Sequence, residues 1–154
     1  MVVYVECKPD VVLLQNLGFP CESIQHLRVF GRGKALKGLA SGQGNRVLAG
    51  EDPLSAQPRM FSGLPIQELP QYRLKIVQRG QNRLILLCPR LEEWLLWLAK
   101  QAGVDPQRYG LPKNSRELHK VINKRLDNLE KLLESLKKHP KSGEILLKLR
   151  DVLQ

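Results

Sequence analysis

Apolar and polar positions in the first fifty residues alternate between short strand-like runs and a helix-like spacing. The β-branched run at 2–6, VVYVE, is typical of a buried parallel strand. A helix is predicted between Pro9 and Gly18, because proline suits a first helical turn and glycine often closes a helix. Two more strands are predicted, one within 24–30 and one at 46–49. Strands that alternate with helices predict an α/β fold with a mostly parallel sheet.

The middle of the chain holds a proline-rich stretch followed by two apolar runs. Residues 53–70 show no clear periodicity and are predicted to form a long loop. The runs at 72–77 and 83–88 predict two strands joined by a tight connection. From Pro89 to Gly103, tryptophan, leucine and alanine recur at helical spacing over a wide face, which predicts a largely buried helix.

The C-terminal part repeats leucine at spacings of three and four, which is typical of amphipathic helices. One helix is predicted to begin at Asn114, a good N-terminal cap, and to end before Pro140; a second is predicted at 143–153. The leucine stripe is most simply part of the core, and dimerisation through it is the alternative. Residues 113–154 are therefore predicted to form a helical hairpin that packs on an α/β domain of residues 1–112.

The chain carries more positive than negative charge: 25 Lys and Arg against 15 Asp and Glu, a formal net charge of +10. This surplus favours an anionic partner, with nucleic acid first and an acidic protein second. The net charge is +3 over 1–50, +2 over 51–112 and +5 over 113–154, so it is spread along the chain. The alternative is that the lysines lie on solvated helix faces and serve solubility alone.

Composition also limits the kind of protein. The hydrophobic fraction of 42% and the charged fraction of 26% are ordinary for a globular protein and exclude a disordered tail. No apolar run approaches the length of a membrane-spanning helix, so we expect no membrane partner. Cys7, Cys21 and Cys88 form neither a CxxC pair nor a zinc spacing, so we expect reduced thiols in a cytoplasmic protein.

Acidic residues follow two of the predicted strands. Glu6 ends the first strand, and Glu51 with Asp52 follows the third. Ligands of parallel sheets bind outside the carboxyl ends of the strands, so these carboxylates converge if the two strands are neighbours. Converging carboxylates with open positions suit Mg²⁺ or Mn²⁺. The alternative is that Glu6 is an ordinary strand-end residue and that Glu51, Asp52 and Pro53 form an ordinary turn.

A glycine-flanked basic turn, GRGK, occupies residues 31–34. Its backbone amides precede a predicted helix, an arrangement common at anion sites, and Arg32 and Lys34 add positive charge. The spacing matches neither a P-loop nor a dinucleotide fingerprint. A phosphate-binding site and a plain tight turn are therefore equal alternatives.

Glu92 and Glu93 lie in the first turn of the predicted buried helix. Carboxylates at that position are favoured by the helix dipole alone. The alternative is that one of them faces the strand ends and completes the acidic cluster. The three histidines, in contrast, show no catalytic spacing to a cysteine or serine, and no role is assigned to them.

Taken in order, the segments VVYVE, GRGK and GEDP resemble the Toprim domain, the magnesium-binding module of topoisomerases, primases and the overcoming-lysogenization-defect nucleases. The segment NRLILLCPRLEEWLL, with EDPLSAQP upstream, is similar to small bacterial Toprim-like proteins. The resemblance to those proteins covers about residues 2–130, and the Toprim part itself about residues 2–88. It implies a mostly parallel Toprim-like sheet flanked by helices.

The resemblance also implies roles for single residues. In a Toprim domain the first-strand glutamate acts as a general acid/base near the metal, and Glu6 matches that position. A D-x-D pair binds the metal; Asp52 matches its second aspartate, whereas Gly50 replaces the first. Glu51 or Glu93 would then complete a Mg²⁺ or Mn²⁺ site. Some Toprim-like proteins of this size are thought to act beside ATPases, so the resemblance names an ATPase as a candidate protein partner.

Two functions follow from these observations. The first is metal-dependent, nuclease-like processing of a nucleic-acid phosphodiester, with Glu6 as the catalytic residue and Arg32 and Lys34 on the phosphate. The second is a non-catalytic nucleic-acid or protein-binding module that keeps the Toprim frame and has lost its metal. Gly50 favours the second function, whereas Glu6, Asp52 and the basic turn favour the first.

Overall fold

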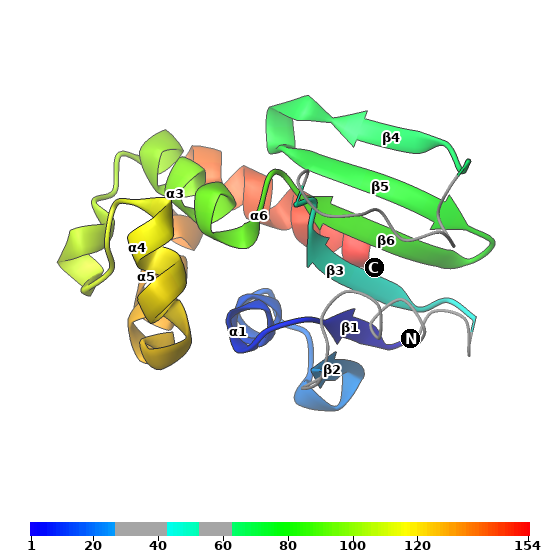
Figure 1. The fold of residues 1–154 in the computed structure, drawn as a ribbon, viewed down its shortest axis with the longest axis horizontal. Coiled ribbons are helices and arrows are strands. Elements are labelled where there is room, and N and C mark those ends of the chain that lie inside the picture. Colours follow the sequence, from blue (N-terminus) through cyan, green and yellow to red (C-terminus); the bar gives the residue numbers. More distant parts are fainter. Residues whose placement is uncertain (27–42, 53–62) are drawn as a thin grey trace.

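The structure is a computed structural model, and it describes residues 1–26, 43–52 and 63–154. Its strands form one six-stranded sheet in the order β2-β1-β3-β6-β5-β4 (Figure 1). The strands are β1 (Val3–Val5), β2 (Ile24–His26), β3 (Arg46–Gly50), β4 (Ile66–Leu69), β5 (Leu74–Arg79) and β6 (Asn82–Leu87). The α-helices of the described part are α1 (Lys8–Asn16), α3 (Leu91–Ala102), α4 (Ser115–Val121), α5 (Leu126–Lys138) and α6 (Pro140–Leu153).

The pairing of the strands confirms an α/β fold with a mixed, mostly parallel sheet. Strand β1 runs parallel to both β2 and β3, and β3 runs parallel to β6. Strands β4 and β5 are antiparallel to their neighbours, and β5 and β6 form the predicted tight hairpin. The carboxyl ends of β1, β3 and β6 therefore meet at one edge of the sheet, and the first residue of β5 lies at the same edge.

The prediction of a loop over the whole of 53–70 was wrong at its C-terminal end. Strand β4 pairs with β5, with Ile66 opposite Val77. It is an edge strand whose residues are mostly exposed, so it lacks the alternation of buried and exposed positions that marks a half-buried strand. Hydrogen bonding to β5, rather than a sequence pattern, defines it.

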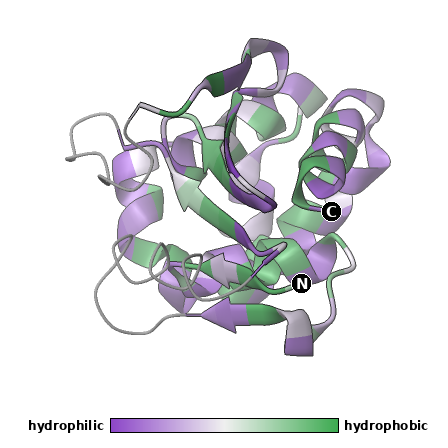
Figure 2. Ribbon diagram, turned by 90° about the vertical axis from the view of Figure 1, so that its right-hand side faces the viewer, coloured by the Kyte–Doolittle hydropathy of each residue, from purple (hydrophilic) through white to green (hydrophobic). Residues whose placement is uncertain are grey.

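Side chains on the two faces of the sheet enter two separate cores, as the period of two along a strand requires. Leu48 and Ile85 face α1, α3, α5 and α6 in the main core and are fully buried. Val47 and Leu84, one residue earlier on the same strands, belong to a smaller cluster on the opposite face. Figure 2 shows the apolar stretches along the strands and on one side of the helices. Full burial of one such aliphatic side chain contributes about 1.5–3 kcal/mol.

The C-terminal helices pack into the main core: α5 lies against α1, and α6 lies against α3 and β6 (Figure 1). Two predicted boundaries in this part were wrong. The single helix expected from Asn114 is interrupted near Arg125, whose backbone is not helical and whose guanidinium donates to the Gly110 carbonyl. The last helix begins at Pro140 rather than at 143, because proline suits a first helical turn. No helix in the described ranges has the length and apolar character needed to cross a membrane.

The end of α6 is fixed by a buried arginine at the start of β3. Arg46 is 8% exposed, and its guanidinium donates to the carbonyl oxygens of Gly44, Gln81 and Gln154. Arg83, on the neighbouring strand β6, donates to the Val152 carbonyl at 3.3 Å. Two cations thus satisfy carbonyl groups at the helix C-terminus, where positive charge is favoured.

Candidate functional site at the carboxyl edge of the sheet

The strands that carry the predicted acidic residues are neighbours, as the sequence analysis required. Val5 of β1 is paired with Leu48 of β3 in parallel register. Glu6 therefore follows β1 at the same edge where Glu51 and Asp52 follow β3. The structure therefore confirms that the two strands are parallel neighbours, the condition on which the predicted site depended.

Glu51 is paired with a lysine of the next strand but one. Its backbone N–H donates to the Leu87 carbonyl at 2.9 Å, which continues the β3–β6 pairing beyond the strand. Its carboxylate contacts the ammonium group of Lys75 on β5, and Glu68 lies 3.7 Å from the same ammonium. The hydrogen bond to Glu51 raises the pKa of Lys75 above its usual value. Lys75 therefore stays charged and neutralises much of the charge of Glu51.

Asp52 has a strained backbone and faces an arginine. Its φ of 44° lies in the left-handed region, which non-glycine residues rarely occupy. Its N–H donates to the Pro89 carbonyl at 2.8 Å, which holds the turn in place. The Arg90 Nε lies 4.0 Å from the Asp52 Oδ1 and also 4.0 Å from the Glu93 Oε1. One guanidinium therefore lies between two of the three predicted metal ligands.

Gly50 lies against the backbone of Arg90. A Cβ atom at position 50 would be 3.3 Å from the Arg90 Cα, which is tighter than an ordinary van der Waals contact. Gly50 is not among the described glycines with a positive φ. The close approach of the β6–α3 connection, rather than a left-handed backbone, therefore explains the glycine. An aspartate here would have to push this connection outward.

A buried pair next to Glu6 was not foreseen from the sequence. The Asp10 carboxylate accepts hydrogen bonds from the Cys7 N–H at 3.3 Å and from the Cys7 Sγ at 3.0 Å, at the start of α1. Burial, together with the negative charges of Glu6 and Glu92, raises the pKa of Asp10 to about 7. Burial also raises the pKa of the Cys7 thiol well above its usual value, which favours the protonated thiol over the thiolate. The helix-start position of Asp10, three residues after Cys7, was the available signal.

The two glutamates at the start of α3 have different partners: Glu92 contacts His119, and Glu93 lies beside Arg90. Glu92 is 12% exposed and its Oε1 lies 2.8 Å from the His119 Nδ1 on α4. Glu93 lies next to Arg90, as described above. The expectation that no histidine has a role is corrected to this extent: His119 holds Glu92. No sequence pattern indicated this pair, because the residues are 27 positions apart on different helices.

The arrangement of these side chains bears on whether the edge can hold a divalent metal ion. In the described ranges, no three His, Cys, Asp or Glu side chains are grouped as ligands of one ion. Instead, Lys75 contacts Glu51, and Arg90 lies beside Asp52 and Glu93. A hard cation bound by these carboxylates would therefore compete with Lys75 and Arg90 for them.

The edge continues into a basic hollow between α3 and α4. This hollow has a volume of about 350 Å³. Its lining includes Arg90, Arg116, Lys120 and His119. The predicted phosphate-binding residues Arg32 and Lys34 lie outside the described residues, so their position relative to this hollow stays a prediction.

No protein family, curated protein or solved structure matches the chain. The α/β sheet and the edge are properties of the structure itself.

Proposed function

We propose that this chain is a Toprim-like nucleic-acid-binding protein that binds its ligand without a resident divalent metal ion. The observation that carries the proposal is the set of ion pairs at the carboxyl edge. Glu51 contacts Lys75, and Arg90 lies between Asp52 and Glu93. Basic side chains of the chain itself thus occupy the positions around the predicted metal ligands.

The ion pairs change what this edge can bind. Lys75 and Arg90 offset part of the charge of the four carboxylates beside them, and the neighbouring hollow adds Arg116 and Lys120. The net charge of +10 attracts polyanions over a longer range. Nucleic acid is favoured over an acidic protein because its phosphates repeat at close, regular spacing and release counterions when lysine and arginine replace them.

We expect binding to depend steeply on salt and to weaken in the double variant Arg32→Ala/Lys34→Ala. Each phosphate contact contributes roughly 0.7 to the logarithmic salt slope for a single strand, so losing two cations flattens the slope by roughly 1.4. The measurement is a titration of a labelled oligonucleotide at two salt concentrations. The matched control is Lys131→Ala/Lys141→Ala, which removes two exposed lysines of α5 and α6. Equal affinity and equal slopes for the parent and both double variants would exclude the basic turn as a contact surface.

A second candidate function is Mg²⁺-dependent, nuclease-like phosphodiester processing with Glu6 as the catalytic residue. One observation favours it: Glu6 and Asp52 follow parallel strands that are direct neighbours in the sheet. The same proposal would make Asp52, Glu51 and Glu93 the metal ligands, after movement of Lys75 and Arg90. An ATPase remains the protein partner that the resemblance suggests for either function.

Calorimetric titration with Mn²⁺ separates the two candidates. We expect weak binding in the parent, because Lys75 and Arg90 compete with the ion for the carboxylates. Gly50→Asp is expected to bind Mn²⁺ more tightly, since a hard cation gains an anionic oxygen. It is also expected to lose about 1–3 kcal/mol of unfolding free energy, because the new Cβ crowds Arg90. Tight binding in the parent that disappears in Glu6→Gln would instead favour the second candidate.

A further inference from the structure

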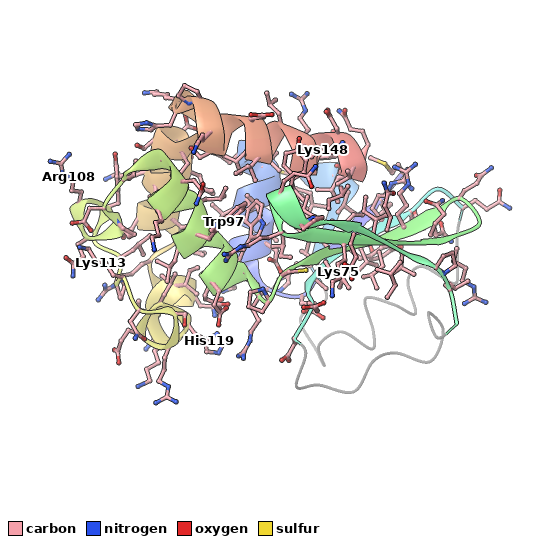
Figure 3. All side chains as sticks on the ribbon, turned by 90° about the horizontal axis from the view of Figure 1, so that it is seen from above. Lys75, Trp97, Arg108, Lys113, His119 and Lys148 are labelled. Carbon is pink, nitrogen blue, oxygen red and sulfur yellow. The ribbon has the colours of Figure 1, made fainter. Side chains whose placement is uncertain are left out.

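Two tryptophans three residues apart on α3 have different environments. Trp94 is fully buried, and its Nε1 donates to the Tyr72 carbonyl at 3.0 Å. Trp97 is only partly buried and lines a hollow of about 830 Å³ beside α3. Figure 3 shows Trp97 on α3, with Lys113 and His119 toward the α4 end of the molecule and Lys75 toward the sheet. Trp94 belongs to the main core, whereas Trp97 packs against that core and also lines the hollow.

An arginine is held over the Trp97 ring by the backbone around it. The Arg73 guanidinium carbon lies 4.8 Å from the ring centroid. Arg73 has a left-handed φ of 49°, and hydrogen bonds from its N–H to Pro70 and from the Cys88 N–H to its carbonyl fix this conformation. In the described ranges, Arg73 and Asp52 are the non-glycine residues with positive φ, and both lie at the carboxyl edge of the sheet. Such strain concentrates at binding sites, where it fixes a side chain in advance.

The hollow beside Trp97 adjoins the smaller basic hollow, because Glu93 and Ser115 line both. The described residues that line the two carry six Arg or Lys against three Asp or Glu. The cations are Arg73, Arg90, Lys100, Lys113, Arg116 and Lys120. Three of these cations are in salt bridges: Lys113 with Asp105 at 3.5 Å, Arg90 with Glu93 at 4.0 Å and Lys120 with Glu117 at 3.9 Å. The two adjoining hollows, called the groove below, therefore combine an aromatic wall with an excess of basic over acidic side chains.

We propose that this groove binds single-stranded nucleic acid, with a base stacked at Trp97 and the backbone phosphates on the surrounding cations. The proposal rests on the proposed function and adds the form of nucleic acid and the place where it binds. Known single-strand sites combine these two features: an aromatic ring that stacks on the base and a positively charged groove that follows the backbone, with arginine contributing a cation–π contact. A duplex does not fit, because its base faces are stacked inside and cannot reach an indole ring in the wall of a hollow.

Tryptophan fluorescence tests the proposal directly, because the buried Trp94 is shielded and Trp97 is the ring that a ligand can reach. The probes are oligothymidylate, a duplex of the same length and thymidine monophosphate, all without divalent metal. We expect the strand to quench the parent and to bind more tightly than the other two probes. In Trp97→Leu, binding measured with a labelled strand should weaken about five- to hundredfold, the range for loss of one stacked base.

Two further variants separate binding from folding. Arg73→Gly should bind the strand several-fold more weakly while its resistance to urea is unchanged or higher, because glycine accepts the left-handed backbone. Lys100→Ala should weaken binding, whereas Lys131→Ala, an exposed lysine on α5, should bind as the parent does. A merely structural Arg73 would give the opposite result, with lower stability and unchanged affinity.

The possible failures are distinct. Strand binding that leaves Trp97 fluorescence unchanged and that persists in Trp97→Leu and Arg73→Gly would overturn this site and leave the proposed function intact. A duplex or a mononucleotide that binds as tightly as the strand would overturn the assignment to single strands. A protein that binds none of the three probes at low salt would overturn both this inference and the proposed function.

Discussion

Replacement of Arg46 by alanine is expected to lower the free energy of unfolding by about 3 kcal/mol, because a buried cation and its hydrogen bonds are removed together. The Arg46 guanidinium satisfies the carbonyl oxygens of Gly44, Asn45, Gln81 and Gln154. In the variant these acceptors face a cavity, and α6 loses its attachment to the start of β3. Urea unfolding followed by circular dichroism measures the loss.

Arg83→Ala provides the control for Arg46→Ala. Arg83 is only partly buried, and it donates to the Val152 carbonyl at 3.3 Å and to the Gln78 side chain at 2.8 Å. We therefore expect it to lose only about 1 kcal/mol. If Arg46→Ala is no less stable than Arg83→Ala, the attachment of α6 through Arg46 does not stabilise the fold.

Asp10→Asn is expected to remove a large dependence of stability on pH. The pKa of Asp10 is raised to about 7 in the folded protein, with burial as the main cause. In the unfolded chain an aspartate has a pKa of about 3.9, so the folded state binds the proton more tightly. Below a pH of about 4, protonated Asp10 therefore adds its full contribution, up to about 4 kcal/mol, to the free energy of unfolding. This contribution is lost as the pH rises from about 4 through about 7.

The comparison of unfolding curves at pH 5 and pH 8 isolates this effect. The parent should lose stability between the two values, whereas Asp10→Asn, which cannot ionise, should lose much less. Asp127→Asn, at an exposed position of α5, should follow the parent. A parent and an Asp10→Asn variant with the same change between pH 5 and pH 8 would show that Asp10 is already ionised at pH 5.

The fold could be predicted for segments whose burial produces a regular spacing of apolar residues in the sequence. The β-branched run before Glu6 and the apolar helix from Leu91 are buried on one or more faces, so their periodicity reveals them. Strand β4 is exposed at the edge, and only its pairing with β5 defines it. The break near Arg125 depends on a hydrogen bond to Gly110, which no local periodicity encodes.

The candidate site, like the fold, could be predicted from the sequence only in part. Glu6 and Asp52 follow neighbouring strands, a condition that the sequence left open because β2 lies between β1 and β3 along the chain. The partners of the carboxylates could not be predicted, because they depend on tertiary structure. The register of β5 and β6 places Lys75 against Glu51, and the packing of α4 places His119 against Glu92. The glycine at position 50 was interpreted as a lost ligand, whereas its contact with the Arg90 backbone gives a steric reason for it.

The central claim, nucleic-acid binding without a resident metal, is tested most directly by one electrophoretic assay with a labelled single strand. The protein and the strand are incubated at low salt, once with a chelator and once with Mg²⁺. The account predicts a complex of equal affinity in both, with the strand intact. A complex that forms only with Mg²⁺, or a strand that is cut by the parent and left intact by Glu6→Gln, would contradict it.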